Sequence, residues 1–407
     1  MFELTALNFI VWAAWVAVLM WLAGAFLTLR GLARQRPLQP AQGGPRLKDD
    51  APLVSVLVPA RNEEGRVLSR CIRSILAQDY ARFEVIAVND RSTDGTAAIL
   101  NAIARADERL RVVDGLETPT GWLGKPYALQ QALDQACGEW VLATDADMIF
   151  DESAMRTAVA LARANDYDAL TLVPRIETET FWERVFAPTF GWFMALGMPM
   201  ERVNDPQRRD AVGVGGFFLI RRAELRRVGE YRAVRAEVAE DLRMAELMKH
   251  SGGRLRIEYA PDLASTRMYS GFSEIWEGFT KNFYAGMKFS LLQTFASIAL
   301  VLSFIVAPPV LAMISAFALA AGASTEWLHL FVPALIVWLI QVFTFGVVNK
   351  SFGVPVRYAL TVPLGHALFV VILMNSAFRI ATGSGVTWKG RKVYERASGI
   401  RPAPRTR

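Results

Sequence analysis

Two carboxylates two positions apart are the first candidates for chemistry. Asp145 and Asp147 follow the apolar run Trp140–Ala143, which has the character of a buried strand. Placing two charges at the end of such a strand costs desolvation energy unless a cation compensates them. Mg²⁺ binds one or two carboxylates together with substrate phosphates, and it can neutralise a diphosphate leaving group. The alternative is that Asp147 or Asp151 only begins the next helix.

A second set of polar residues ends two other strand-like runs, in the loops Val58–Glu64 and Val88–Thr96. In an open α/β sheet, ligands bind outside the carboxyl ends of the strands, so both loops are expected to face one crevice. Capping of the following helix accounts for Asp94 but leaves Asp90 unexplained. We therefore expect Asp90 to accept hydrogen bonds from a ribose or a base.

A third pair, Glu240 and Asp241, begins a helix-like segment. Carboxylates at a helix N-terminus are favoured by the helix dipole whatever the function. The functional alternative is that Asp241 takes a proton from an attacking hydroxyl group, which requires a base within hydrogen-bond reach. The residues alone leave both explanations open.

These residues are expected to be positioned by a mostly parallel sheet. Between Leu53 and Tyr259, short β-branched runs alternate with longer amphipathic segments, a pattern typical of βαβ units. The expected strands are Leu53–Val58, Phe83–Val88, Arg111–Val113, Trp140–Thr144, Leu170–Val173, Phe217–Ile220 and Leu255–Tyr259. The expected helices are Glu63–Gln78, Thr93–Arg105, Pro126–Ala136, Glu152–Ala164 and Asp241–His250. The predicted fold class is α/β, with helices flanking the sheet and transmembrane helices at both ends of the chain.

The composition indicates a membrane protein. The 407 residues are 53% hydrophobic with a mean hydropathy of +0.24, both high for a soluble globule. The net charge of +6 suits anionic lipid or a phosphorylated ligand. Basic residues cluster beside apolar spans rather than among exposed aromatics, which argues against nucleic-acid binding. The two cysteines lack a CxxC spacing, so neither a disulfide framework nor a zinc site is expected.

The N-terminal apolar run, Phe9–Leu29, predicts an anchor rather than a cleaved signal peptide, because it is long enough to span a bilayer. Basic residues follow this run: Arg30, Arg34 and Arg36. The positive-inside rule then places the next domain in the cytoplasm. We expect a multi-pass protein of the inner (plasma) membrane, with residues 1–35 as the anchor and residues 36–52 as a linker.

A catalytic domain over residues 53–270 and a juxtamembrane segment over 271–290 are expected to precede transmembrane helices within 291–382. The apolar blocks are Leu291–Gly322, Trp327–Val348 and Tyr358–Ile380. The first is too long for one upright helix and contains Pro308-Pro309, so it is either one kinked span or a tight hairpin. Three crossings would place the basic tail, 383–407, outside the cell, against the positive-inside rule. We expect a hairpin or a re-entrant segment, and a cytoplasmic tail.

One further aromatic segment, Phe181–Val203, lies inside the expected catalytic domain and carries charges near both ends. Such a segment is typical of an interfacial helix lying on the membrane. A helix buried in the soluble core explains the pattern equally well.

Together the loops resemble those of family 2 glycosyltransferases with the A-type fold. The matching pieces occur in the family's order and cover about half of the chain, and such an ordered set is more specific than any one motif. They are Pro59–Glu64, Asn89–Thr96, Gly124-Lys125 with Ala128-Leu129, Thr144–Asp147, Gly215-Gly216 with Phe218 and Arg221-Arg222, and Glu240-Asp241.

The resemblance implies particular roles for these positions. The donor, usually a uridine nucleotide sugar, would be bound by Ala60, Arg61, Glu63, Asp90, Lys125 and Asp145. Mg²⁺ or Mn²⁺ would be held by Asp147 together with Asp145. Asp241 would be the base of an inverting displacement. The positions implied for the acceptor, or for closing over the site, are Gly215, Gly216, Glu240, Trp276, Lys281, Asn282, Trp388 and Arg391.

Segments beside the C-terminal spans narrow the resemblance. Processive polysaccharide synthases of this family carry a QxxRW motif, which this sequence lacks. The segments Trp276–Asn282, Val386–Arg391 and Gly121–Lys125 instead resemble membrane-bound lipid glycosyltransferases near the hopanoid-associated, carotenoid-acid and ceramide-glucosylating enzymes. The alternative for the first two segments is a juxtamembrane aromatic and basic belt.

These expectations combine into one predicted reaction: a sugar moves from a nucleotide-sugar donor, expected to be a UDP-sugar, to a membrane lipid at the cytoplasmic face. The reaction is expected to depend on a divalent metal and to invert the anomeric carbon. Two alternatives stand beside it, a processive polysaccharide synthase and a catalytically silent membrane scaffold of the same fold.

Overall fold

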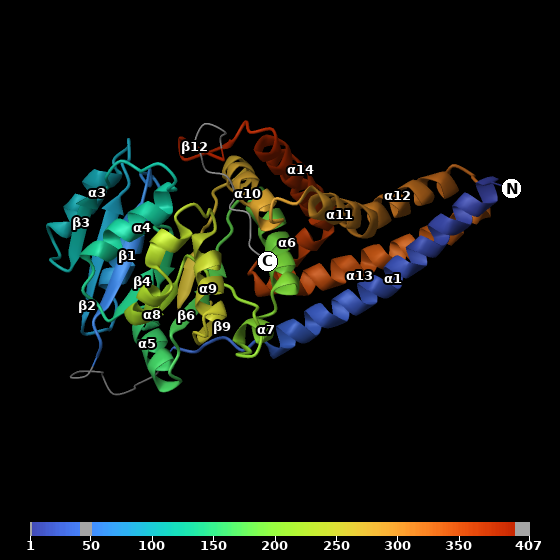
Figure 1. The fold of residues 1–407 in the computed structure, drawn as a ribbon. Helices are drawn as coiled ribbons and strands as arrows, with labels where there is room; N and C mark the ends of the chain where they lie inside the picture. The colour runs from blue at the N-terminus through green and yellow to red at the C-terminus, as the bar shows by residue number, and fades with distance from the viewer. Residues whose placement is uncertain (1, 41–50, 395–407) are drawn as a thin grey trace. The chain divides into compact units, whose positions relative to one another are not determined.

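The computed structural model describes residues 2–40 and 51–394, with side chains from residue 10 onward and without that of Lys392. The chain forms two compact units, a helical unit and a sheet unit, both seen in Figure 1. The helical unit comprises Met1–Gln35, Thr178–Leu196 and Tyr269–Thr382. The sheet unit comprises Arg36–Glu177, Gly197–Met268 and Gly383–Arg407. Positions 41–50 of the predicted linker and 395–407 of the predicted tail lie outside the described residues.

The sheet unit is built on seven strands in the order β3-β2-β1-β4-β8-β6-β9. They are β1 (Val54–Ala60), β2 (Phe83–Asn89), β3 (Leu110–Asp114), β4 (Trp140–Ala143), β6 (Ala169–Val173), β8 (Phe218–Arg221) and β9 (Leu255–Tyr259). Strand β8 runs antiparallel to its neighbours β4 and β6, and the other neighbouring pairs are parallel. The predicted mostly parallel sheet and its seven expected strands are therefore confirmed.

Helices cover both faces of this sheet, and this explains why a central strand such as β4 is continuously apolar. Along β1, Val56 and Val58 pack into one core and Leu57 into the other. The flanking helices include α2 (Leu68–Leu76), α3 (Thr96–Ala104), α4 (Gly124–Gln135), α5 (Ala154–Ala164), α8 (Arg222–Arg227) and α9 (Glu240–His250). Helix α2 begins five residues later than predicted, because the backbone of Glu63 and Glu64 is hydrogen-bonded to a neighbouring loop.

Two smaller β-structures were not expected from the sequence. A three-stranded sheet joins β5 (Met148–Phe150), β10 (Ala264–Thr266) and β7 (Arg175–Ile176) in that order. Near the end of the described chain, β11 (Val386–Trp388) and β12 (Arg391–Val393) form a hairpin. Its two turn residues, Lys389 and Gly390, have φ values of 44° and 75°. Positive φ at both positions is the geometry of the tight turns that match strand twist.

The helical unit contains α1 (Phe2–Arg34), α6 (Phe181–Gly197), α10 (Phe272–Gly286), α11 (Leu291–Val301), α12 (Ala307–Ala320), α13 (Leu328–Ser351) and α14 (Val362–Ala381). Among the described residues, four segments are long and apolar enough to cross a membrane: Ile10–Arg34, Leu291–Ala320, Thr325–Ser351 and Val356–Ala381. The first C-terminal block is thus one continuous helical run, and the hairpin alternative for it is wrong. In Figure 1, α13 lies along both α1 and α12.

A proline pair explains an irregular turn inside this run. Pro308 and Pro309 lack the N–H groups that would otherwise pair with the carbonyls of Phe304 and Ile305. The chain there takes a π-helical turn, Leu302–Val306, and side chains satisfy the two carbonyls. Gln341 Nε2 donates to Ile305 O at 3.1 Å and to Phe304 O at 3.4 Å. Trp21 Nε1, from α1, donates to Phe304 O at 2.6 Å.

The aromatic segment Phe181–Val203 divides between the two units. Helix α6 packs inside the helical unit, where Phe186 contacts Phe279 with ring centroids 4.7 Å apart. Its Trp192 stacks on Trp21 of α1 at 5.7 Å. The alternative of a helix in the soluble core is therefore wrong for α6, and the interfacial position remains a prediction. The remainder, α7 (Met200–Asn204), belongs to the sheet unit.

Candidate active site

The loops that follow β1, β2 and β4 lie at one edge of the sheet, because these parallel strands are neighbours with β1 in the middle. Asp90 directly follows β2, and Asp145 and Asp147 follow β4. From β1 the strand order continues to β2 and β3 on one side and to β4 on the other, so the connections on the two sides run in opposite directions. Open α/β sheets form their binding crevice at such a point. Helix α4 begins between Asp90 on one side and Asp145 and Asp147 on the other. Its first residue, Gly124, is close to Asp90, since a Cβ added there would lie 2.9 Å from Asp90 Oδ2, and its second residue is Lys125.

Reciprocal hydrogen bonds join the loops after β1 and β2. The Asn62 amide donates to Ser92 Oγ at 3.1 Å, and Asn62 Oδ1 accepts from the Thr93 amide at 2.9 Å. Asp94 accepts from the Glu64 amide at 2.9 Å and from the Thr96 amide at 3.0 Å. The N-cap of α3 is Gly95, without a side-chain cap, so Asp94 does not cap the helix as predicted, and its contacts are structural in another way. Its function is to hold the two loops together beside Asp90.

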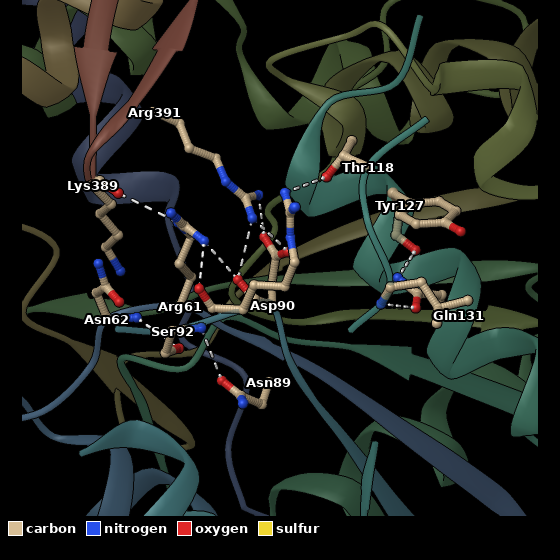
Figure 2. Close-up of polar contacts among 12 residues, drawn as sticks. Arg61, Asn62, Asn89, Asp90, Ser92, Thr118, Tyr127, Gln131, Lys389 and Arg391 are labelled. Carbon is tan, nitrogen blue, oxygen red and sulfur yellow. Dashed lines mark hydrogen bonds and ion pairs between the residues drawn. The ribbon is translucent and has the colours of Figure 1, made fainter. Parts of the chain in front are cut away.

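Asp90 lies at the centre of a group of basic residues (Figure 2). The Arg391 guanidinium donates to both Asp90 oxygens, from Nη1 to Oδ2 at 2.6 Å and from Nη2 to Oδ1 at 3.0 Å. Arg61 Nη1 donates to the Asp90 carbonyl at 2.7 Å. Lys389 forms an ion pair with the buried Glu63 carboxylate. Three of the predicted donor-binding residues thus lie together, in contact with the β11–β12 hairpin.

Lys125 bridges two carboxylates near the start of α9. Its Nζ lies 2.6 Å from Asp145 Oδ1 and 2.7 Å from Glu240 Oε1. Burial alone would lower the pKa of Lys125, but Asp145, Glu240 and Asp241 raise it well above its ordinary value. Burial raises the pKa of Glu240 to about 7, against the opposing effect of Lys125. The cluster therefore contains a firmly charged ammonium that compensates the acidic side chains around it.

Asp147 lacks a direct basic partner of this kind: among the described residues its carboxylate forms no hydrogen bond or ion pair, and the more distant charges of Arg66 and Lys389 lower its pKa only in part. Burial, followed by the charges of Asp145 and Glu63, raises its pKa to about 7. A divalent cation would relieve this cost, so Asp147 fits the role of a metal ligand. The described residues include no group of three or more His, Cys, Asp or Glu side chains suited to a metal ion. Further ligands would then come from a bound substrate, as is usual for Mg²⁺ at phosphate sites.

Asp241 is oriented by two backbone amides at the start of α9. Its Oδ2 accepts from the Gly215 amide at 2.7 Å, and its Oδ1 accepts from the Leu242 amide at 2.8 Å. A Cβ at Gly215 would lie 2.9 Å from Asp241 Oδ2, 3.0 Å from Lys125 Nζ and 3.2 Å from Asp145 Oδ2. Glycine at this position therefore keeps open the space among three charged groups. This space is part of a pocket whose lining also includes Tyr231, Glu240 and Phe218.

The other predicted positions are distributed over both units. Gly216 packs against β5, because a Cβ there would lie 2.5 Å from Met148 Sδ. Trp388 and Arg391 are on the β11–β12 hairpin of the sheet unit. Trp276, Lys281 and Asn282 are on α10 of the helical unit, and their roles remain predictions.

Two residues of the site were not found from the sequence. Lys389 lies in the matching segment Val386–Arg391 but was given no role of its own, although the Lys-Gly pair was a signal for a hairpin turn. Tyr231 has a buried hydroxyl in the pocket beside Glu240 and Asp241, and no spacing in the sequence marks it.

A mostly parallel sheet with carboxylates at the ends of neighbouring strands, and an acidic pair after the central strand β4, defines the glycosyltransferase A-type fold. Residues 55–229 match the model of Glycosyl transferase family 2. The chain therefore carries a family 2 glycosyltransferase domain, as the ordered motifs predicted.

Known proteins resemble the chain over part of their length. A β-monoglucosyldiacylglycerol synthase from Synechocystis sp. is 33% identical over 187 residues, 44% of this chain and 38% of the relative. An N-acetylglucosaminyltransferase from Mesorhizobium japonicum is 28% identical over 242 residues, 55% of this chain and 53% of the relative. The alignments thus span between about two fifths and about half of these relatives.

Solved structures also resemble the chain, among them one that does so over most of its length. The mannosyltransferase PcManGT from Pyrobaculum calidifontis, in complex with GDP-Man and Mn²⁺, superposes with a TM-score of 0.56 at 20% identity. The similarity covers 91% of this chain and 98% of that one. At this identity the likeness supports the fold alone, which agrees with the predicted A-type architecture.

Proposed function

We propose that this protein transfers a sugar from a nucleotide-sugar donor to a hydroxyl group of a membrane lipid at the cytoplasmic face of the inner membrane. The observation that carries the proposal is the convergence of Asp90, Asp147 and Asp241 at one edge of a family 2 sheet, in a chain whose described part has four membrane-compatible helices. The Synechocystis relative is named as a β-monoglucosyldiacylglycerol synthase, which supports a lipid acceptor.

The donor is proposed to be a UDP-sugar, with its nucleoside near Asp90 and its diphosphate near Asp147. Mg²⁺ or Mn²⁺ would be held by Asp147 and would supply charge neutralisation for the leaving diphosphate. Mn²⁺ accompanies GDP-Man in the PcManGT complex, which supports a divalent ion and a nucleotide diphosphate sugar in general. Asp145 is committed to Lys125, so its contribution is to hold that ammonium near the donor.

Asp241 is proposed to be the base. One carboxylate oxygen accepts from the Gly215 amide and the other from the Leu242 amide, and each keeps a lone pair free for an acceptor hydroxyl. The acceptor oxygen attacks the anomeric carbon as its proton passes to Asp241, and the bond to the nucleoside diphosphate breaks on the opposite face. The expected result is inversion at that carbon.

The test is transfer by the full chain in lipid nanodiscs, with radiolabelled UDP-glucose and a diacylglycerol-containing lipid mixture. We expect one sugar per lipid, activity that EDTA abolishes, and loss of transfer in Asp241→Asn. The matched control is Asp166→Asn, at a side chain that is 74% exposed and precedes β6, at the edge of the sheet opposite the site loops. A ladder of products would support the polysaccharide synthase instead, and absence of metal-dependent transfer or hydrolysis of UDP-, GDP- and other donors would support the silent scaffold.

Counting membrane crossings supports a cytoplasmic tail. The chain leaves the sheet unit at Met268, contains three candidate spans, and re-enters the sheet unit at Gly383. Arg391 of the tail pairs with Asp90, which supports a tail and a sheet on the same side of the membrane and therefore an even number of crossings between them. We propose that Val356–Ala381 does not cross. It has the lowest mean hydropathy of the three, 1.7 against 2.4 and 2.3.

Contacts of α14 support this assignment. Asn375 Nδ2 donates to Thr280 Oγ1 at 3.1 Å, and Ser376 Oγ donates to Thr280 O at 2.5 Å, so α14 makes polar contacts with α10 along its C-terminal half. The test is labelling of sealed membrane vesicles with a membrane-impermeant maleimide. A cysteine placed by Ala381→Cys should react from the same side as the exposed native Cys137, and one placed by Ser324→Cys from the opposite side. Labelling of positions 381 and 324 from the same side would contradict the assignment.

A further inference from the structure

Two arginines of the helical unit share one aromatic ring. Tyr358 lies on the short helix η4 (Val356–Thr361), directly before α14. Cζ of Arg184, from α6, lies 5.9 Å from the centre of the Tyr358 ring, and Cζ of the neighbouring Arg357 lies 6.0 Å from it. Among the described residues, neither guanidinium forms an ion pair or a hydrogen bond. Two positive charges are therefore gathered at one ring without an acidic side chain, and a bound anion would reduce their repulsion.

Tyr358 is also one end of a row of five aromatic rings that crosses the first turns of α6 and α10. Its ring centroid is 5.9 Å from that of Phe181, which is 5.2 Å from that of Trp182. The Trp182 centroid is 5.0 Å from that of Phe272, and the row ends at Trp276, 6.0 Å further along. Phe181 and Phe272 are 46% and 41% exposed, so the chain leaves part of this aromatic row uncovered.

A buried carboxylate holds the starts of α6 and α10 together. Glu183 Oε1 accepts from the Gly271 amide at 2.8 Å, directly before α10, and from the Thr180 hydroxyl at 2.8 Å. Glu183 Oε2 accepts from the Glu179 amide at 2.7 Å. The carboxylate next to Arg184 in sequence is thus used inside the protein, and it fixes the two helical turns that carry the aromatic row.

The proposed membrane crossings place this surface at the cytoplasmic face. Helix η4 follows the candidate span that ends at Ser351, and α6 and α10 begin soon after the chain leaves the sheet unit. Val356 and Leu360, which flank Arg357 and Tyr358 on η4, are exposed, so the same turn carries apolar and basic side chains. Aromatic rings are enriched at the level of lipid headgroups, and the cytoplasmic leaflet has a negative surface potential that attracts basic residues.

We infer that Arg184 and Arg357 form a binding site for the headgroup of an anionic phospholipid, with the aromatic row lying at the depth of the headgroups. A guanidinium donates two parallel hydrogen bonds to a phosphate, which makes arginine suited to this ligand. The phosphate of a zwitterionic lipid is already compensated by the cation of its own headgroup, so an anionic lipid is preferred. This site requires the helical unit to lie in a membrane, but it does not require the proposed sugar transfer.

The first test is native mass spectrometry of the full chain, freed of lipid in detergent and titrated with phosphatidylglycerol or phosphatidylcholine of the same acyl chains. The wild type should bind its first phosphatidylglycerol roughly 10-fold more tightly than its first phosphatidylcholine. The variant with both Arg184→Gln and Arg357→Gln should bind the two lipids equally, with its affinity for phosphatidylcholine unchanged. Equal binding by the wild type, or a preference that persists in this variant, would overturn the inference.

The matched control removes the same charge elsewhere on the helical unit. Lys288→Gln combined with Lys350→Gln, at two exposed lysines, should keep the preference for phosphatidylglycerol. If the control loses the preference as fully as the arginine variant, net charge explains the binding and the site is refuted.

The second test is thermal unfolding in nanodiscs. In phosphatidylcholine alone, the arginine variant should unfold at the wild-type temperature, which shows that it is folded. Adding phosphatidylglycerol should raise the melting temperature of the wild type and of the lysine control, because a ligand of the native state stabilises it, but not that of the arginine variant. An equal rise in all three proteins would contradict the site. Neither test measures sugar transfer, so their failure and a failure of the proposed function are distinguishable.

Discussion

Asp145 and Asp147 stand two positions apart, but among the described residues only Asp145 has a basic partner, the Lys125 ammonium at 2.6 Å. The difference between the two residues follows from the elements that lie beside each of them. Asp145 follows β4 toward α4 and α9, whereas Asp147 immediately precedes β5 of the small sheet. One carboxylate therefore belongs to a compensated cluster, and the other remains free for a ligand.

Substitution of these two residues should have different consequences. Asp147→Asn should abolish metal-dependent transfer, by at least about 100-fold, while the melting temperature stays equal or rises, because a partly buried charge without a direct partner is removed. Asp145→Asn should lower the melting temperature as well as the activity, because Lys125 loses a partner. Activity at saturating Mn²⁺ and thermal unfolding by scanning calorimetry measure the two effects. Equal losses of stability in both variants would contradict this division of roles.

Asp94 lies in the same region, and we expect it to stabilise the structure rather than to take part in the reaction. Asp94→Ala removes hydrogen bonds from the Glu64 and Thr96 amides and from the Thr96 hydroxyl. We expect a loss of about 1–2 kcal/mol in the free energy of unfolding, with kcat/KM within about 3-fold of wild type below the unfolding temperature. Denaturant unfolding and initial-rate assays provide the two numbers. A loss of activity as large as that of Asp147→Asn, with the fold intact, would place Asp94 in the chemistry instead.

Local pattern was sufficient for the elements that form the donor crevice. Strands such as β1 and β2 are long, apolar and followed by turn residues, so their ends and the loops with Asp90 were predictable. Helix starts were less predictable: α2 was expected from Glu63, but the amides of Glu63 and Glu64 bond to Thr96 and Asp94 of another loop. Strand β5, with three residues, is too short to show a period of two.

Contacts between distant parts of the chain account for what was missed. Arg391 was assigned a closing role only by resemblance, and nothing near it in sequence indicates that it pairs with Asp90, 301 positions earlier. Lys389 reaches Glu63 in the same way. Gln341 is also unpredictable locally, since the carbonyls that it satisfies are freed by prolines more than thirty positions away.

The base at the acceptor end should show its environment in the pH profile. Burial raises the pKa of Asp241 above its ordinary value, and the Lys125 charge opposes this rise. Transfer requires the ionised carboxylate, so activity falls as the pH drops through this pKa. Lys125→Met removes the opposing charge, so the pKa should rise and the acidic limb of kcat/KM should move to higher pH by about 1 unit.

The measurement is kcat/KM from about pH 5 to about pH 9, normalised to each protein's own plateau, since Lys125→Met also lowers the plateau itself. The matched control is Lys350→Met at the end of α13, an exposed lysine outside the sheet unit, whose profile should equal that of the wild type. An unmoved acidic limb in Lys125→Met would contradict the role of Lys125 in holding Asp241 ionised. A limb moved to lower pH would contradict Asp241 as the base.

Gln341 tests whether the helical unit depends on the carbonyls freed by Pro308 and Pro309. Gln341 is fully buried in a largely apolar helix, and among the described residues its amide and Trp21 Nε1 are the two side-chain donors to Phe304 O and Ile305 O. Gln341→Leu leaves Ile305 O without this donor in an apolar environment. A loss of about 1–2 kcal/mol in stability is expected, because interhelical hydrogen bonds contribute this much in membranes.

Gln293→Leu, at an exposed position of α11, is the matched control and should leave stability unchanged. Thermal unfolding in nanodiscs, followed by helical circular dichroism, measures both. If both variants unfold at the wild-type temperature, the π-helical turn is held by the prolines and the surrounding packing alone, and Gln341 must be explained in another way.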